Sequence, residues 1–480
     1  MAEYIVRQGG QGEGGTLPTL SAAAAVAKRG DVVIVEPGIY RETLRPGEGM
    51  SWFGEKGAVI DGGWKGGNLA TTEDNATGVL VRYPDVTVRG FEIRNVPGQG
   101  VNVTTGGHRF LMEGCEIHHT FHGGFAANGL GVPIQGITIR NCHVHDIAMS
   151  GKWRETPVNG CFLFKSAHGA LVEDCIVERG YGEGMAAGSR SVGVTFRRVT
   201  VRDTRHLLMY VNRARDILIE DCTLYQQGLP EFTQSDGDVG AGLVIGDEES
   251  GAKDDDWQHS ENVIIRRCLV VNAGSLFAVR NNAKPGKGGD DGYNTNIKNL
   301  VVERCTFIAG PQSKGGLNIA ENEYGAGNVA GRITANVFVL NRLAGVGAGY
   351  RSSAPGVRVE GNAISGMPSE LAADNVHIDA TALVDPFAAV QAFALDNYRP
   401  KPGGVVDLGR MGALDVVVPP PPPDPPDDPP PLDTPDWATL LDHLDTAQAT
   451  LATATLAAED CAAELAAARQ WVEEQSGATE

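Results

Sequence analysis

Residues 137–144 read ITIRNCHV, and near copies of this stretch recur along most of the chain. The shared pattern is apolar-x-apolar-x-x-Cys-x-apolar, and its Cys position returns after 23 to 46 residues. A repeat period above 20 residues with occasional insertions predicts a solenoid. The other copies are FLMEGCEI (110–117), ALVEDCIV (170–177), ILIEDCTL (217–224), VIIRRCLV (263–270) and LVVERCTF (300–307), with Phe91, Val199, Asn336 and Asn362 in the Cys position of four more.

The repeat is predicted to form β-strands rather than helices. Its apolar positions alternate with a period of two, its residues are β-branched or aliphatic, and Gly or Asn follows each run. We therefore predict an all-β, right-handed parallel β-helix of about ten turns across residues 31–366. A second strand is expected after each turn, in GVNVT (100–104), GCFLFK (160–165), HLLMYV (206–211), AGLVIG (241–246), LFAVR (276–280) and GLNIA (316–320).

The cysteines of the repeat are expected to point inward as a ladder of small apolar groups. Strands stacked in register bring equivalent residues to about 4.8 Å from one another. Buried reduced thiols fit this place, because a regular interior ladder in a protein made in a cytoplasm needs no disulfides. A metal site is disfavoured because the chain has no CxxC pair. The predicted ladder is Cys115, Cys142, Cys175, Cys222, Cys268 and Cys305.

The N-terminal segment is predicted to cap the solenoid. Residues 17–44, LPTLSAAAAVAKRGDVVIVEPGIYRETL, contain an Ala-rich amphipathic helix (about 18–28), a strand (32–35) and a Pro-Gly turn. A helix over the first turn would cover the unpaired strand edge there. We therefore assign residues 1–30 to an N-terminal segment with the capping helix and residues 367–418 to a closing segment.

These stretches resemble the pectate-lyase-like superfamily of right-handed β-helix proteins. The resemblance rests on the N-terminal segment, on AVIDGG (58–63) and on GVVDLGRMGALD (404–415), and it covers roughly residues 17–415. It implies the fold. It leaves the activity open, because the superfamily includes lyases, hydrolases, epimerases and catalytically inert spikes.

The C-terminal tail is predicted to be a stalk with an oligomerisation helix. Residues 419–435 form a Pro/Asp-rich linker, which favours extended polyproline II. In residues 436–476, apolar residues from Trp437 to Val472 alternate at spacings of three and four, which predicts a coiled coil. A homo-oligomer, expected to be a trimer, follows from this pattern. The alternative is a helix that docks on its own chain.

Charge narrows the class of partner. The formal net charge is −20, and residues 419–480 hold 13 acidic residues against Arg469 alone. This balance argues against nucleic acid or an anionic membrane as a partner. There is no secretory signal and no apolar run of about 20 residues. We expect a protein made in a cytoplasm, which stays there, is released by lysis or is carried on a virion.

One lateral face of the β-helix is the predicted ligand surface. Positions one and three after each Cys position should point outward and stack, bringing His, Glu, Arg and Tyr together. His145 or Tyr225 with Glu178 or Arg202 could form a proton-transfer pair. The alternative is a solvated outer face without a function. The predicted ligand-binding residues are Arg94, His118, His145, Glu178, Arg202 and Tyr225.

Two further places carry candidate catalytic residues. The long insertion before Cys268 holds Asp236, Asp247 and Glu248, which could pair as glycosidase carboxylates or bind calcium. The alternative is a solvated acidic loop. Lys165, beside His168, is a candidate base of the kind that lyases use. No cofactor and no metal site are predicted, calcium remaining the weaker alternative.

Two hypotheses of function follow. The first is a virion-associated adhesion protein, such as a phage minor tail protein or tailspike, which binds host surface glycan and other tail proteins. It accounts for the stalk and the coiled coil together, and several linked binding faces would add avidity. The second is a polysaccharide lyase, glycoside hydrolase or epimerase that acts on an acidic polysaccharide.

Overall fold

The computed structural model describes residues 2–9, 16–67, 69, 77–129, 131–153, 160–234, 237–246, 260–280, 297–320, 329–340, 350–352, 356–366, 371–379 and 383. The chain divides into two units, Met1–Asp427 and Asp428–Glu480, and the description below concerns the first. The predicted linker and coiled coil lie outside the described residues, as does most of the predicted closing segment.

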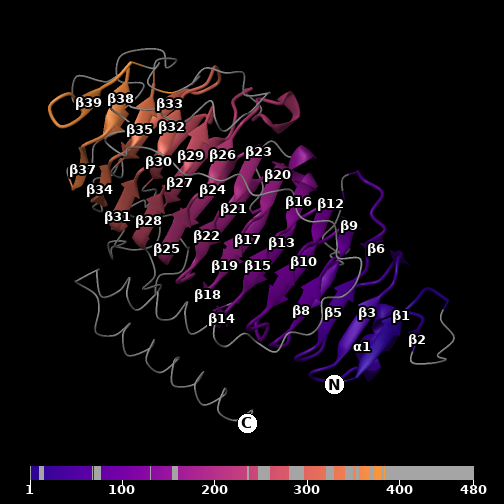
Figure 1. The fold of residues 1–480 in the computed structure, drawn as a ribbon. Coiled ribbons are helices and arrows are strands. Elements are labelled where there is room, and N and C mark those ends of the chain that lie inside the picture. The colour runs from indigo at the N-terminus through magenta and orange to yellow at the C-terminus, as the bar shows by residue number, and fades with distance from the viewer. Residues whose placement is uncertain are drawn as a thin grey trace, which may run out of the picture. The chain divides into compact units, whose positions relative to one another are not determined.

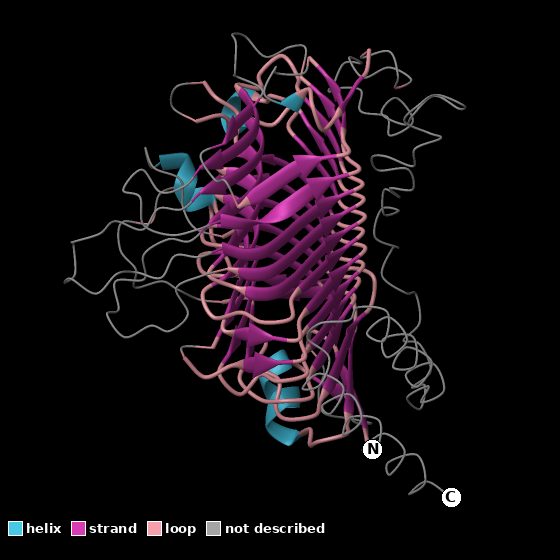
Figure 2. Ribbon diagram, turned by 90° about the vertical axis from the view of Figure 1, so that its left-hand side faces the viewer, coloured by secondary structure: helices cyan, strands magenta, loops and turns pink. Residues whose placement is uncertain are grey.

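Three long sheets of parallel strands, named A, B and C here, build a β-helix (Figures 1 and 2). One turn of the chain passes through β11 (Leu111–Glu113) in sheet A, β12 (Glu116–Thr120) in sheet B and β13 (Phe125–Asn128) in sheet C. The next turn stacks on it in register, for example Ile117 on Val144. The predicted parallel β-helix is therefore confirmed.

The strands of each sheet, in spatial order and within the described residues, are the following. Sheet A contains β2 (Thr16–Leu17), β1 (Glu3–Val6), β3 (Val32–Val35), β5 (Ser51–Gly54), β8 (Thr87–Arg89), β11, β15 (Thr138–Arg140), β19 (Leu171–Glu173), β22 (Thr195–Arg197), β25 (Arg215–Glu220), β28 (Glu261–Arg266), β31 (Ile297–Glu303), β34 (Val329–Thr334) and β37 (Val357–Glu360). Sheet B contains β4 (Gly38–Tyr40), β6 (Ala58–Asp61), β9 (Glu92–Val96), β12, β16 (His143–Ile147), β20 (Ile176–Gly180), β23 (Thr200–Thr204), β26 (Thr223–Tyr225), β29 (Leu269–Val271), β32 (Thr306–Ile308), β35 (Val337–Val339), β38 (Ala363–Ser365) and β39 (Val376–His377). Sheet C contains β7 (Val79–Val81), β10 (Val101–Thr104), β13, β17 (Phe162–Lys165), β21 (Glu183–Gly188), β24 (Leu207–Asn212), β27 (Ala241–Gly246), β30 (Ser275–Arg280), β33 (Gly315–Ala320) and β36 (Tyr350–Ser352). A short pair, β14 (Ile134–Gln135) with β18 (Ala167–His168), and two 3-10 turns, η2 (Met149–Trp153) and η3 (Pro230–Phe232), complete the elements.

The repeated motif is a corner between two sheets and not one strand, which corrects the sequence-based expectation. Its first half lies in sheet A and its second half in sheet B. The residue just before the Cys position has a positive φ, for example 53° at Asn141 and 49° at Arg198. Asn and Asp adopt this left-handed conformation more readily than other residues, but Arg198 shows that the corner imposes it on others too.

The Cys ladder lines the core as predicted. Seven of the eight cysteines lie in the described part of the chain, and all seven are buried free thiols. Two of the sulfur atoms also accept a weak hydrogen bond from the backbone of the preceding turn: Cys175 Sγ from Cys142 N and Cys305 Sγ from Cys268 N, both at 3.4 Å. Beyond Cys305, Asn336 and Asn362 continue the same column, and both are fully buried.

The predicted capping helix is α1 (Leu20–Val26), at the N-terminal end of the solenoid (Figure 1). Thr19 is its N-cap and accepts a hydrogen bond from Ala22 N at 3.0 Å. Leu20 and Ala23 are fully buried against the first turns, so the helix closes that end of the core. Among the described residues no helix is long and apolar enough to cross a membrane.

Sheet A carries a column of alternating charge on its outer face. The register places each member opposite one of the other sign, as in Arg89–Glu113–Arg140, with N–O distances of 2.8 and 2.7 Å. Alternation of this kind stabilises the correct register and opposes slippage by one turn. The column is Arg89, Glu113, Arg140, Glu173, Arg197, Glu220, Arg266 and Glu303.

Candidate functional site

The outer face of sheet B brings together the six residues that sequence analysis singled out. Strand register stacks each on the next turn, from β9 through β12, β16, β20 and β23 to β26. The column is Arg94, His118, His145, Glu178, Arg202 and Tyr225. Five steps of about 4.8 Å make the column about 24 Å long. Three of its members, His145, Glu178 and Tyr225, are buried beneath their neighbours.

The N-terminal end of the column is an ion-pair group around Arg94. Its guanidinium group donates to Asp61 at 3.0 Å and to Glu92 at 2.7 Å. Glu92 also lies 3.2 Å from Nε2 of His118 on the next turn. This end therefore presents the carboxylate of Glu92 and the guanidinium group of Arg94 to solvent, while Asp61 is buried beneath them.

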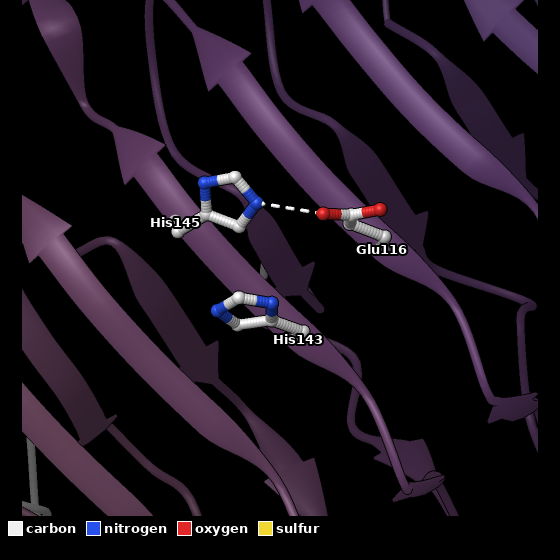
Figure 3. A group of neighbouring side chains, drawn as sticks. All are labelled: Glu116, His143 and His145. Carbon is white, nitrogen blue, oxygen red and sulfur yellow. Dashed lines mark hydrogen bonds and ion pairs between the residues drawn. The ribbon is translucent and has the colours of Figure 1, made fainter. Parts of the chain in front are cut away.

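Imidazole rings occupy the middle of the column. His118 stacks face to face on His145, with ring centroids 4.9 Å apart and planes inclined by 1°. His143 lies beside them on β16, its ring centroid 4.4 Å from that of His145. Nε2 of His145 faces Oε1 of Glu116 at 2.9 Å (Figure 3). The side chain of Glu116 is half exposed, so this part of the column is open to solvent.

Glu178 anchors the C-terminal half of the column. It is 2% exposed and accepts hydrogen bonds from His143 at 3.1 Å, from Arg179 at 2.7 Å and from Arg202. Burial opposes its ionisation, but these partners lower the pKa of its carboxyl to about 2. Arg202 also donates to the hydroxyl of Tyr225 at 2.8 Å. Glu178 is thus a fixed anion that orients two guanidinium groups.

The surroundings shift the pKa values of the two stacked histidines, His118 and His145, in opposite directions. Burial and the adjacent His145 lower the pKa of His118. Burial also acts on His145, but its hydrogen bonds to Asp146 and Glu116 raise the pKa of this ring. Asp146, which bonds both His145 and Arg179, has a pKa well below its ordinary range.

A further column at the fourth position after the Cys position was missed by sequence analysis. Strict alternation would point these residues inward, but each has φ between 50° and 52°, which turns the side chain outward. The signal was a polar residue where the alternation called for an apolar one. Asp146 and Arg179 pair across this column at 2.8 Å. The members are Asn95, His119, Asp146, Arg179 and Asp203.

The sheet B patch, as the name is used below, comprises both columns from Arg94 to Tyr225 with Glu116 and His143. Glu116, His143 and His145 bring one donor atom each to within 4.8 Å of one another and could hold a metal ion, although sequence analysis predicted none. Lys165 is not in this patch: it ends β17 in sheet C, and its neighbour His168 bonds to the carbonyl of Arg190. Candidate residues Asp236, Asp247 and Glu248 lie outside the described residues.

Comparison with known proteins agrees with the fold. The family model of a right handed beta helix region matches residues 77–253. No curated protein matches the sequence. The structure is similar to a pectate lyase at 12% identity, over 84% of this chain and 90% of that one, with a TM-score of 0.43. It is also similar to the A-module of an Azotobacter vinelandii mannuronan C-5 epimerase, at 11% identity over 71% and 93%, with a TM-score of 0.45.

A tailspike protein, that of Dettilon, is similar at 12% identity over 71% of this chain and 63% of that one, with a TM-score of 0.37. At these scores and identities the likenesses carry no argument about activity. The described residues form a right-handed parallel β-helix, and the function of this β-helix is argued below from the sheet B patch.

Proposed function

We propose that the β-helix binds a polysaccharide along the sheet B patch and serves as an adhesion protein. The observation that supports this proposal is the patch itself. It brings imidazole, carboxylate, guanidinium and phenol groups from six successive strands into one strip about 24 Å long, enough for several sugar rings. Groups of this kind donate and accept hydrogen bonds, which sugar hydroxyls require.

Comparison with sheet A strengthens the proposal. The sheet A column simply alternates Arg and Glu, which is what we expect if its only role is to hold neighbouring strands in register. The sheet B patch breaks this rule, with His118 beside His145 and with Tyr225 at its end. Its four carboxylates and three guanidinium groups nearly balance, and two of the carboxylates, Glu178 and Asp203, are buried, so hydrogen bonds to sugar hydroxyls would carry binding more than net charge.

The proposal predicts a loss of glycan binding from one face only. Replacing Arg94 and His118 together by alanine removes donors that are half-buried at the patch, and we expect the affinity to fall about 10-fold or more. Arg140→Ala, which removes a similarly paired guanidinium group from sheet A, is the matched control and should bind as the unaltered protein does. Calorimetry of the full chain with a panel of neutral and uronate polysaccharides measures both. Equal losses in both variants, or no binding to any polymer, would refute the proposal.

Catalysis on an acidic polysaccharide is the second candidate. The observation that favours it is the closeness of the His145 ring to Arg179, at 3.0 Å, because a guanidinium charge there could neutralise a uronate carboxylate while a ring accepts a proton. Prolonged incubation of the same uronate polymers with the full chain tests this. Cleavage or epimerisation that His145→Ala and Glu178→Ala abolish would support an enzyme, and uncut, unchanged polymers would leave adhesion as the function.

The C-terminal tail, residues 419–480, supports a proposal about the oligomeric state and the location of the protein. The Pro/Asp-rich linker and the heptads of residues 436–476 are the features that favour a homo-oligomer, a trimer in this proposal, carried on a virion among other tail proteins. Light scattering of the full chain should give three times the mass of one chain. Removal of residues 419–480 should give the mass of a single shortened chain, and a full-length monomer would contradict the proposal.

A further inference from the structure

Glu116, His143 and His145 form a constellation that glycan binding does not use as a unit. His143 and His145 are two residues apart on β16, so both rings project from the same face of the strand. Glu116 lies directly opposite His143 on the adjacent strand β12. Figure 3 shows the three side chains converging on one region outside the sheet. Nitrogen or oxygen donor atoms, one from each, lie within 4.8 Å of one another.

We propose that these three side chains bind one divalent late transition metal ion, with Zn²⁺ as the reference ion. Two imidazole nitrogens and one carboxylate oxygen are a donor set that Zn²⁺ accepts, with a fourth position left for water or another ligand. Calcium and magnesium prefer oxygen ligands only, and a site with two imidazoles disfavours them.

The surroundings of both rings support this proposal. Histidines that bind metals usually donate their second ring N–H to a carboxylate, which fixes the tautomer and the ring orientation. Nδ1 of His145 lies 2.8 Å from Asp146 and 3.0 Å from Arg179, while its Nε2 faces Glu116. Nε2 of His143 lies 3.1 Å from the buried Glu178, so its Nδ1 remains for a metal. One nitrogen of each ring therefore lies next to a supporting carboxylate, Asp146 or Glu178, and the other nitrogen can coordinate the metal ion.

Room and charge also suit a cation. Coordination bonds of about 2.0–2.1 Å place tetrahedral ligands about 3.4 Å apart, so the most widely separated donors need to approach each other by up to about 1.4 Å. The half-exposed side chain of Glu116 can make this adjustment and leaves an entry path from solvent. The carboxylate of Glu116 would offset part of the charge of the ion, whereas Asp146 and Glu178 are already paired with Arg179 and Arg202.

Zinc titration of the full chain by calorimetry tests the site without any glycan. We expect one ion per chain with a Kd of about 1 µM or below. His145→Gln and Glu116→Gln should weaken binding by about 100-fold or more, and Asp146→Asn, which removes a supporting carboxylate and no ligand, by about 10- to 100-fold. His377→Gln, on the exposed strand β39, is the matched control and should bind as the unaltered protein does.

Cobalt gives an independent measurement, because Co²⁺ in a tetrahedral site absorbs visible light. The spectrum should appear on titration and be lost in His143→Gln. Glu116→Gln alters a half-exposed residue and should fold normally, so its result stands even if a histidine variant does not fold. Absence of saturable binding, or equal zinc affinity in Glu116→Gln and the unaltered protein, would overturn the proposal. The glycan test uses Arg94 and His118 instead, so the metal site and the glycan site can each be refuted without the other.

Discussion

Asn336→Ala is expected to destabilise the C-terminal turns of the β-helix by about 3–5 kcal/mol, more than any other single change proposed for this core. Asn336 stands where earlier turns have cysteine, between β34 and β35, and it is fully buried. Its Oδ1 accepts a hydrogen bond from Cys305 N at 2.8 Å, and its Nδ2 donates to the carbonyl of Val302 at 2.9 Å.

The cost comes mainly from the groups left behind. Alanine would leave the N–H of Cys305 and the carbonyl of Val302 buried without these partners, each at about 1–3 kcal/mol. Asn362 would be affected too, since its Oδ1 accepts from both the backbone N–H and the side-chain amide of Asn336, at 2.9 and 3.0 Å. The asparagine ladder thus links neighbouring turns through side chains as well as strands.

Cys222→Ala is the matched control, because it changes the same position of an earlier turn. The Cys222 thiol donates only weak hydrogen bonds, to Phe196 and Glu220 carbonyls at 3.5 and 3.2 Å. Its loss should cost about 1 kcal/mol, mostly packing. Native-state hydrogen exchange of β35 and β38 measures the local effect in a solenoid, whose turns can open separately. If Asn336→Ala opens these strands no more easily than Cys222→Ala opens its own turn, the ladder is not what stabilises this end.

The sequence predicted the stacking of turns but not their internal geometry. Inward residues recur with a visible period because the core tolerates only small or apolar groups there, so the Cys column could be found. The corner between sheets A and B could not be found in the sequence, since the left-handed position holds Asn141 and Asp174 in some turns and Arg198 or Ala335 in others. There the backbone conformation follows from stacking on neighbouring turns and not from local preference.

The alternating charge on sheet A lies within the repeated motif, but a single copy of the motif does not show it. The residue two places before the Cys position runs Glu113, Arg140, Glu173, Arg197 and Glu220, which becomes a pattern only when turns are compared. The outward column of sheet B followed from strand alternation. Its companion at Asp146 and Arg179 did not, because a positive φ reverses the direction that alternation predicts.

The free energy of unfolding of the Asp203→Asn variant should increase relative to that of the unaltered protein as the pH rises. Asp203 is 1% exposed on β23 and accepts one hydrogen bond, from Gln227 N at 2.7 Å. Burial raises its pKa to about 6, against an ordinary 3.8, because this single bond and the nearby charges of Arg202 and Arg179 do not offset desolvation, and Glu178 opposes them.

A folded pKa above the unfolded one means that the native state binds the proton more tightly. Its contribution to stability is complete below pH 3.8 and is lost as the pH rises through about 6. The difference between the two pKa values corresponds to about 3 kcal/mol. Asparagine has no ionisation to suppress and tolerates the φ of 50° at this position, so its advantage should grow by about 2–2.5 kcal/mol between pH 4 and pH 7.

Urea unfolding of both proteins from pH 4 to pH 7 measures the difference between their free energies of unfolding. The change of this difference with pH is the test, because any pH-independent cost of the amide cancels. Asp85→Asn is the matched control, at another residue of positive φ, 61°. Its ion pair with Arg109 lowers the pKa of Asp85, so the unaltered protein is favoured above the unfolded pKa and the slope should have the opposite sign. A pH-independent difference for Asp203→Asn would show that this carboxyl titrates normally and that burial does not control it.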